Sequence, residues 1–472
     1  MRSVKILSLS LILAASALLV AENAAAIQNA PAQAQPQPAE DEITLKARQF
    51  LEAVSHEDFQ AAVKDFGETM LKLSGPDKLA PFWKQFKTQV GAFKKQTATR
   101  RERQDPYDFI LVTCEFEKAS LNARLVFDKD KKIAGFQFLP VLPESKYEPP
   151  AYVDSNLFTE TDVTVGGGEW KLPGILTVPK GAGPFPGLVL VHGSGPNDRD
   201  ETIGPNRPFK DLAWGLASRG IAVLRYDKRT KVHGARIVAE PKLFSTLTVK
   251  EEVIDDAVEA FKVLLLDKRV DPGRAAILGH SLGGMLIPRI ALAAEKLKPA
   301  GFIIMAGLTR PLEETMMSQF KYLFALNGPL SEESKKQLQD YQTQVDKIKA
   351  LKASDIGSQE RYFFASPAYW LDMRGYYPPE VAVRVEHPML ILQGGRDYQV
   401  TTEDFDNWKK ALGGRSDVTS KLYPKLNHLF FEGQGLITPN EYQYTHGSVA
   451  KYVIDDIVAW FGTLKGSAET KK

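Results

Sequence analysis

Apolar residues in the second part of the chain fall into short continuous runs separated by longer amphipathic stretches. The runs cover residues 188–192, 221–227, 275–280, 301–307 and 389–395. Continuous apolar runs of this length are typical of strands buried on both faces of a parallel sheet. The stretches at 209–218 and 249–266 carry apolar residues at helical spacing. Strands alternating with helices predict an α/β architecture, a mostly parallel sheet with helices on both faces.

The beginning of this region has a different pattern. Residues 161–165 and 169–179 are two strand-like runs joined by three glycines, Gly166 to Gly168. This arrangement predicts an antiparallel hairpin before the parallel strands. Together with the alternating part, it predicts one large α/β domain over residues 150–465.

Residues 42–142 predict a separate, smaller α+β domain. Helical spacing of apolar residues covers 43–54 and 58–66, and strand-like runs follow at 109–117, 122–128 and 133–140. Helices followed by successive strands favour an antiparallel sheet with helices segregated to one side. A Pro-rich joint, LPESKYEPPAY, then leads into the larger domain.

The interval at 309–385 is too long for an ordinary connection between two core strands, since connections usually have about 4–6 residues. It is rich in polar helix-forming residues and contains aromatic clusters, including AYWLDMRGYY. We interpret it as a helical cap over the active site. The alternative is a helical decoration that touches no substrate.

The first residues predict a targeting signal. Arg2 and Lys5 precede an uncharged apolar run, 6–20, and then the small residues Ala24 to Ala26. This is the pattern of a cleaved signal peptide over 1–26, and an uncleaved anchor or a buried helix is the alternative. Residues 27–41 are a Pro/Gln/Ala-rich linker. We therefore expect an exported protein, periplasmic or secreted, with no stable membrane span after processing.

Composition narrows the classes of function. The formal net charge of +2 gives no indication of nucleic acid or an anionic membrane as partner. Cys114 is the one cysteine, which excludes an internal disulfide and a four-cysteine metal site.

The strongest chemical motif is GHSLG, with Gly279 and Gly283 around Ser281. It follows the run 275–280 directly and precedes a helix-like stretch, 282–297. A serine on a sharp strand-to-helix turn needs small neighbours, so that its hydroxyl projects from the carboxyl edge of the sheet. We predict Ser281 as a nucleophile.

A serine nucleophile needs a base, and an acid to orient that base. Of the seven histidines, His428 alone follows the last strand in a loop. Asp397 follows the run 389–395, and the order Ser281, Asp397, His428 is that of a G-x-S-x-G hydrolase. Asp404 and Asp406 are rival acids, interpreted as surface positions on the next helix.

An oxyanion also needs two N–H donors. The N–H of Leu282, after the nucleophile, is one, and the loop HGSGPNDRD supplies Ser194, or alternatively Gly195, as the other. An ordinary Gly-rich turn is the structural alternative. Asp198, Arg199 and Asp200 are expected to line the entrance or to pair with one another, and Asp227 to form a structural ion pair.

The motifs HGSGPNDRD, RYDKR, GHSLGGM, AYWLD and LQGGRDYQV resemble those of the α/β-hydrolase superfamily over residues 161–463, and within it of exported bacterial carboxylesterases. The resemblance implies an α/β-hydrolase fold and hydrolysis of short acyl esters. Those enzymes carry a small N-terminal domain of unknown role, similar to the cone-shaped ketosteroid-isomerase-like fold, and 42–142 resembles it. Serine aminopeptidases and dienelactone hydrolases are less similar, and the latter use cysteine where Ser281 stands.

The expected reaction is acyl transfer from a small-molecule ester to water, for which no metal or organic cofactor is required. One alternative is an aminopeptidase-like amidase in which a cap carboxylate such as Asp372 binds an amine. The other is a hydrolase without activity that serves for binding, although no member of the triad is missing. The sequence indicates neither the acyl chain nor the oligomeric state.

Overall fold

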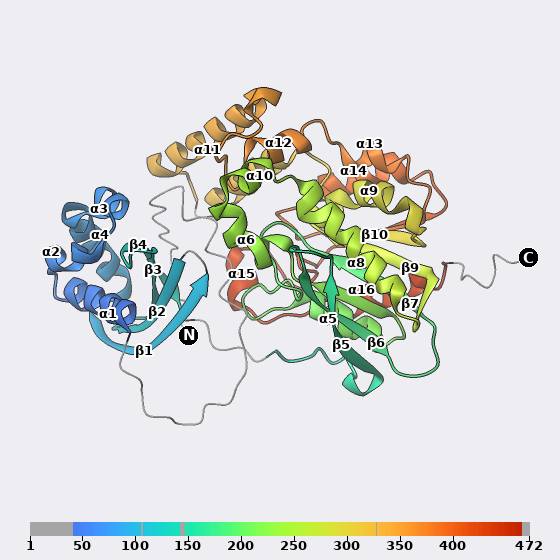
Figure 1. The fold of residues 1–472 in the computed structure, drawn as a ribbon, viewed down its shortest axis with the longest axis horizontal. Coiled ribbons are helices and arrows are strands. Elements are labelled where there is room, and N and C mark those ends of the chain that lie inside the picture. The colour runs from blue at the N-terminus through green and yellow to red at the C-terminus, as the bar shows by residue number, and fades with distance from the viewer. Residues whose placement is uncertain (1–40, 105–106, 142–146, 327, 465–472) are drawn as a thin grey trace, which may run out of the picture. The chain divides into compact units, whose positions relative to one another are not determined.

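The computed structural model describes residues 41–104, 107–141, 147–326 and 328–464. The predicted signal peptide and all but the last residue of the predicted linker lie outside these ranges. The described residues form two compact units, one ending at residue 141 and one beginning at residue 147 (Figure 1). Within the described residues, no helix has both the length and the apolar character needed to span a bilayer.

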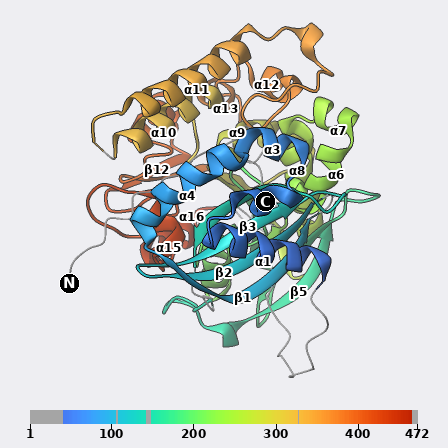
Figure 2. The same ribbon diagram turned by 90° about the vertical axis from the view of Figure 1, so that its left-hand side faces the viewer.

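The first unit combines helices with one antiparallel sheet (Figure 2). Its helices are α1 (Glu42–Ser55), α2 (Phe59–Ala62), η1 (Val63–Asp65), α3 (Glu68–Ser74) and α4 (Pro76–Val90). Its strands are β1 (Phe93–Gln104), β2 (Tyr107–Phe116), β3 (Ser120–Phe127) and β4 (Ile133–Pro140), in the order β1-β2-β3-β4. The core of the unit is aromatic and centres on Phe50, Trp83, Phe116 and Phe127.

The sequence pattern missed α3, α4 and β1 of this unit. The β1 sequence, FKKQTATRRERQ, has almost no apolar residues because the strand lies at the edge of the sheet. Charged side chains are common on edge strands, where they hinder pairing with another chain. Such a strand has no alternating hydrophobic pattern to reveal it.

The second unit is built on an eight-stranded sheet of order β12-β11-β10-β9-β7-β8-β6-β5. Its strands are β5 (Phe158–Val165), β6 (Leu172–Pro179), β7 (Phe185–Val191), β8 (Ala222–Tyr226), β9 (Val270–His280), β10 (Gly301–Met305), β11 (Met389–Gly394) and β12 (Val418–Tyr423). Neighbouring strands pair in parallel along the order β12-β11-β10-β9-β7-β8. Strand β6 pairs antiparallel with β8 and also with β5, and β5 and β6 form the predicted hairpin.

Helices follow most strands of this sheet. They are η2 (Ser155–Leu157), α5 (Pro208–Ala217), α6 (Arg229–Ala239), α7 (Pro241–Thr246), η3 (Lys250–Ile254), α8 (Asp255–Leu266), α9 (Leu282–Ala294), η4 (Glu295–Leu297), α10 (Leu312–Ala325), α11 (Glu332–Ala350), η5 (Ala353–Asp355), α12 (Pro367–Met373), α13 (Pro378–Ala382), α14 (Thr402–Leu412), α15 (Pro439–Tyr444) and α16 (Lys451–Phe461). The chain steps from β7 to β8 in one direction and from β8 to β9 in the other. Right-handed crossovers therefore place α5 and α8 on opposite faces of the sheet.

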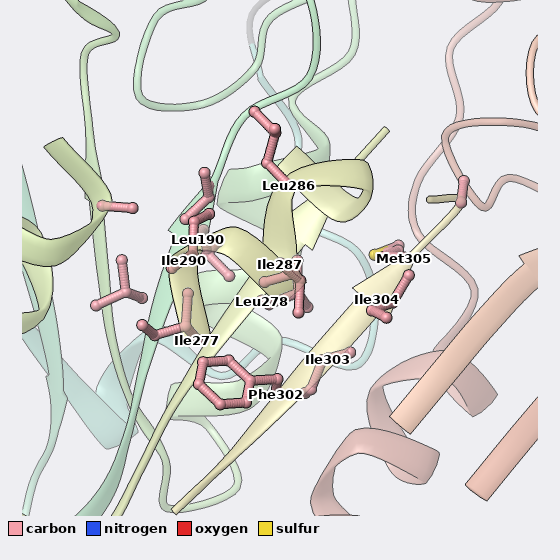
Figure 3. Close-up of a cluster of buried hydrophobic side chains, with 14 of the residues drawn as sticks. Leu190, Ile277, Leu278, Leu286, Ile287, Ile290, Phe302, Ile303, Ile304 and Met305 are labelled. Atoms are coloured by element: carbon pink, nitrogen blue, oxygen red, sulfur yellow. The ribbon is translucent and has the colours of Figure 1, made fainter. Parts of the chain in front are cut away.

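The core of the second unit lies where α9 packs on β9 and β10 (Figure 3). Leu286, Ile287 and Ile290 of α9 are buried among side chains of the two strands, including Ile277 and Phe302. Each aliphatic side chain buried in this way stabilises the fold by about 1.5–3 kcal/mol. This packing fixes the start of α9, and with it the turn that carries Ser281.

The residues between β10 and β11 form the helices α10 to α13. Tyr322 of α10 stacks on Tyr398, the neighbour of Asp397, with ring centroids 4.8 Å apart. Tyr376, just before α13, donates a hydrogen bond to the carbonyl oxygen of Met285 in α9. These contacts hold the inserted helices against the carboxyl end of the sheet.

Candidate active site

Ser281 lies on a strained turn between β9 and α9. Its backbone has φ 54° and ψ −115°, a conformation that residues other than glycine rarely adopt. A Cβ added at Gly279 would lie 2.2 Å from the Gly283 carbonyl oxygen, and one at Gly283 would lie 2.5 Å from the Val191 carbonyl oxygen. Both glycines are therefore required by close backbone contact, and they leave the Ser281 side chain partly exposed.

The loop after β7 lies directly against this turn, since β7 pairs with β9. A Cβ built on Gly193 would be 3.6 Å from the Ser281 hydroxyl oxygen. The N–H of Gly193 donates to Glu201, whereas the N–H groups of Ser194 and Gly195 have no hydrogen-bond partner in the described part of the chain. The N–H of Leu282 belongs to the first turn of α9, where helical N–H groups lack an intrahelical partner. The predicted oxyanion donors thus lie on Leu282, which follows Ser281, and on the two residues after Gly193, which is next to Ser281.

Asp397 and His428 are brought together by the ends of β11 and β12. Asp397 Oδ2 lies 2.6 Å from His428 Nδ1, and both side chains are buried. The other carboxylate oxygen, Oδ1, accepts the N–H groups of Gln399 and Val400 at 2.8 and 3.0 Å. Because the carboxylate is held by the backbone, it fixes the orientation of the His428 ring.

His428 lies beside His280, the residue that precedes Ser281. The centroids of the two imidazoles are 4.7 Å apart, and His280 Nε2 lies 3.0 Å from the carbonyl oxygen of His428. The Ser281 hydroxyl itself forms no hydrogen bond among the described residues. In hydrolases without a bound ligand, the hydrogen bond between a serine and its histidine is often long or poorly aligned.

The charged residues near the site pair mainly with residues of β8 and with Asp227, which directly follows it. Arg199 binds Asp227 through two hydrogen bonds of 2.9 and 2.8 Å, and Asp200 binds the buried Arg225. Asp198 accepts the N–H groups of Asp200 and Thr202. Asp227 thus forms the structural ion pair that was predicted for it. Among the described residues, the side chain of Arg199 forms no ion pair with Asp198 or Asp200, because Arg199 pairs with Asp227 and Asp200 with Arg225. The Asp200 N–H does donate to Asp198, so these two neighbours are joined by a hydrogen bond within the loop.

Asp404 is not a surface residue, which corrects the interpretation of its position. It is fully buried, and one oxygen accepts the N–H and the hydroxyl of Thr309 at 2.9 and 2.7 Å. Arg310 pairs with it at 2.9 Å. The helical pattern of α14 gave no sign of this burial, since the partners come from the loop after β10. Asp406 is exposed, as predicted.

The sequence analysis did not identify three residues that lie near the candidate site, namely Glu201, Lys228 and His280. All three are buried around Gly193 and Ser281. A buried charged residue is a signal for function only when its burial is known, and the polar sequences around Glu201 and Lys228 suggested exposed loops. No group of three or more His, Cys, Asp and Glu side chains in the described ranges is arranged to hold a metal ion.

A mostly parallel sheet with a strained serine turn after a central strand defines an α/β-hydrolase. Residues 188–435 match the model of the alpha/beta hydrolase family, and the chain belongs to that family. Residues 47–136, in the first unit, match a family of proteins of unknown function, DUF3887.

The chain is similar over most of its length to an esterase of Thermotoga maritima, EstD. The two are 41% identical over 411 residues, which are 87% of this chain and 93% of that protein. An esterase from Pyrobaculum calidifontis is 16% identical with a TM-score of 0.40, the match covering 64% of this chain and 85% of that one. A puromycin-hydrolyzing peptidase of Mycobacterium tuberculosis is also 16% identical with a TM-score of 0.40, covering 80% and 49%. Likeness as distant as the last two has no bearing on the reaction.

Proposed function

We propose that this chain is a serine carboxylesterase that hydrolyses carboxylic esters through an acyl-enzyme on Ser281. The observation that carries the proposal is the 2.6 Å contact between Asp397 and His428 at the edge of the sheet where Ser281 lies. The Thermotoga relative supports the same reaction, because it is an esterase and matches both units of the chain.

In the first half-reaction, the Ser281 oxygen attacks the ester carbonyl while His428 Nε2 takes the hydroxyl proton. Asp397 stabilises the imidazolium that forms, without accepting the proton. Negative charge develops on the former carbonyl oxygen, where the N–H groups of Leu282 and of Ser194, or alternatively Gly195, stabilise it. His428 then protonates the departing alcohol, and the acyl group remains on Ser281.

In the second half-reaction, His428 removes a proton from water, which attacks the acyl-enzyme. The same N–H groups hold the second oxyanion, and the proton returns to Ser281 as the acid leaves. The chain's own residues are sufficient for each of these steps.

We assign short acyl chains to this enzyme on the sequence resemblance. The cap helices α10 to α13 would limit the space for the substrate, since α10 is stacked beside Asp397 through Tyr322 and Tyr398. Against the amidase alternative, Asp372 is already bound to Arg289 by contacts of 3.0 and 3.1 Å. This carboxylate is therefore not available to a substrate amine.

The test is Ser281→Ala, with Ser218→Ala as a control in the same unit. We expect hydrolysis of p-nitrophenyl acetate to fall by at least about 10³-fold in Ser281→Ala and to be unchanged in Ser218→Ala. A fluorophosphonate should label wild type and control, but not Ser281→Ala. Full activity or labelling of the Ser281 variant would refute the proposal.

We also propose export through a signal peptide at 1–26, on the strength of the basic head, the apolar run and the alanines. N-terminal sequencing of protein from a bacterial periplasm or medium should start near Ile27. A protein that stays in the cytoplasm with its first residues intact would contradict this proposal.

A further inference from the structure

The peptide groups of Gly193, beside Ser281, are held from both sides by buried charges of opposite sign. Glu201 Oε1 accepts the Gly193 N–H at 2.7 Å. Lys228 Nζ donates to the Gly193 carbonyl oxygen at 2.9 Å. Both side chains are buried, and removing a charge from water costs several kcal/mol. A backbone segment in an ordinary turn does not need two such partners.

The two contacts fix the orientation of the peptide that joins Gly193 to Ser194. The Gly193 carbonyl and the Ser194 N–H belong to one trans peptide, in which they point in opposite directions. When Lys228 draws the carbonyl oxygen to one side, the Ser194 N–H is turned to the other. Glu201 meanwhile occupies the N–H of Gly193, which removes it from competition. Asn197 Nδ2 adds a third contact by donating to the Ser194 carbonyl oxygen at 3.0 Å.

The Glu201 side of this arrangement continues to the loop of His428. Glu201 Oε2 lies 2.9 Å from His280 Nδ1 in an ion pair that lacks the direction of a hydrogen bond, and His280 Nε2 contacts the His428 carbonyl oxygen at 3.0 Å. Burial acts to raise the pKa of Glu201, but His280 and the other neighbours outweigh it and lower that pKa. Burial likewise acts to lower the pKa of His280, and Glu201 outweighs it and raises that pKa. The pair therefore favours its charged form.

The Lys228 side continues to the cap. Lys228 Nζ lies 3.1 Å from Glu252 Oε1, and Tyr369 of α12 donates to Glu252 Oε2 at 2.9 Å. One continuous set of polar contacts thus joins the cap, the loop after β7, the Ser281 turn and the His428 loop. All its members from Glu201 to Tyr369 are buried, so water does not compete with them.

We propose that Glu201 and Lys228 are positioning residues that orient the Gly193–Ser194 peptide and so set the Ser194 N–H as the second oxyanion donor. The proposal rests on the proposed esterase function. It goes further by choosing Ser194 over Gly195 and by assigning the choice to two residues that never touch substrate.

The experiment measures Glu201→Ala and Glu201→Gln against wild type, with p-nitrophenyl acetate as substrate and a trifluoromethyl ketone as a mimic of the tetrahedral intermediate. Misplacing one oxyanion donor lowers kcat by about 10²-fold. We expect that loss in Glu201→Ala, with KM within about threefold, and a parallel loss of affinity for the ketone. Glu201→Gln retains an oxygen that accepts the Gly193 N–H, so its loss should stay within about tenfold.

Asp211→Ala is the matched control. Asp211 is an equally buried carboxylate on α5 that accepts a backbone N–H, from Val449 at 3.0 Å, and its other hydrogen-bond partner is the Tyr147 hydroxyl. We expect kcat and ketone affinity to be unchanged in this variant. If Glu201→Ala does not fold, Lys228→Met tests the same peptide from its carbonyl side, with the same expected split between kcat and KM.

Three results would overturn the inference. One is a Glu201 or Lys228 variant whose kcat and ketone affinity stay within about threefold of wild type. Another is a kcat loss without a loss of ketone affinity. The third is an equal loss in Asp211→Ala. Failure of the esterase proposal itself would look different, because wild type would then neither hydrolyse the ester nor react with a fluorophosphonate.

Discussion

At the scale of single residues, the site depends on backbone atoms that approach more closely than a side chain would permit. Gly283 has the carbonyl oxygens of Val191 and His192 within 2.7 Å of where its Cβ would be. The same contact that excludes a side chain presses α9 against the loop carrying Gly193. The backbone contacts of Gly283 therefore contribute both to the stability of the fold and to the position of the loop beside Ser281.

Gly283→Ala should consequently affect both. We expect a destabilisation of about 3 kcal/mol, since the neighbouring atoms are backbone and cannot move aside cheaply. Esterase activity should fall by more than about tenfold in the fraction that folds, because the loop must shift. Chemical denaturation and active-site titration measure the two effects. Gly234→Ala, with no atom within 4 Å of the added Cβ, is the control and should be neutral or stabilising.

Asp211 gives a second prediction at this scale, for the pH dependence of stability. Burial raises the pKa of Asp211 to about 7 from 3.8. Between these values the folded carboxyl keeps its proton while the unfolded chain has lost it. The contribution of the group is thus complete below about pH 4 and is lost as the pH rises through about 7.

The variant Asp211→Asn carries no such charge, and its amide can serve both Tyr147 and the Val449 N–H. Relative to wild type, its free energy of unfolding should therefore rise between pH 4 and pH 8, by about 4 kcal/mol at most. Urea denaturation at several pH values measures this difference. A difference that does not change with pH would show that Asp211 ionises normally.

At the scale of elements, the helices between β10 and β11 are attached to the catalytic unit by a few polar contacts. Asp372 of α12 pairs with Arg289 of α9, whose guanidinium also lies over the Tyr376 ring. Both partners of the ion pair are partly exposed, so its contribution is modest. The ion pair with Arg289 gives the Asp372 carboxylate a structural role, so binding of a substrate amine is not needed to explain it.

Asp372→Asn should then lower stability by about 1 kcal/mol or less and change kcat/KM for an ester by less than about threefold. Parallel assays with an acetyl ester and an aminoacyl amide measure its effect on selectivity. A selective loss of amide hydrolysis would instead indicate that Asp372 binds an amine, and would favour the amidase alternative.

At the scale of the whole molecule, each of the two units has a hydrophobic core of its own. The core around Phe50 and Trp83 contains residues of the first unit alone, and the core around α9 and β9 contains residues of the second alone. A unit with a closed core has the main requirement for folding by itself.

We therefore expect a chain beginning at residue 147 to fold and to hydrolyse p-nitrophenyl acetate with a kcat within about tenfold of the full chain. Circular dichroism and the ester assay test this, with p-nitrophenyl esters of increasing acyl length to show whether the first unit influences the choice of substrate. An insoluble or inactive product would show that the second unit depends on the first.

The sequence by itself determined the elements whose chemistry is local. Continuous apolar runs marked the parallel strands, because strands buried on both faces have no polar side. The GHSLG motif, Asp397 and His428 were accessible for a similar reason, since each follows a strand and parallel strands end at one edge. The edge strand β1 was not accessible, because its side chains face water and leave no pattern.

Tertiary structure alone decided which charges are buried. Asp404, Glu201 and Lys228 lie in polar sequences, and only the approach of distant segments removes water from them. Glu201 meets Gly193 across its own loop, Lys228 meets it from the end of β8, and His280 reaches the His428 loop 148 residues further along. Removing these charged side chains from water costs free energy, and it also strengthens the contacts that they make. The removal from water depends on the whole fold and not on neighbours in sequence.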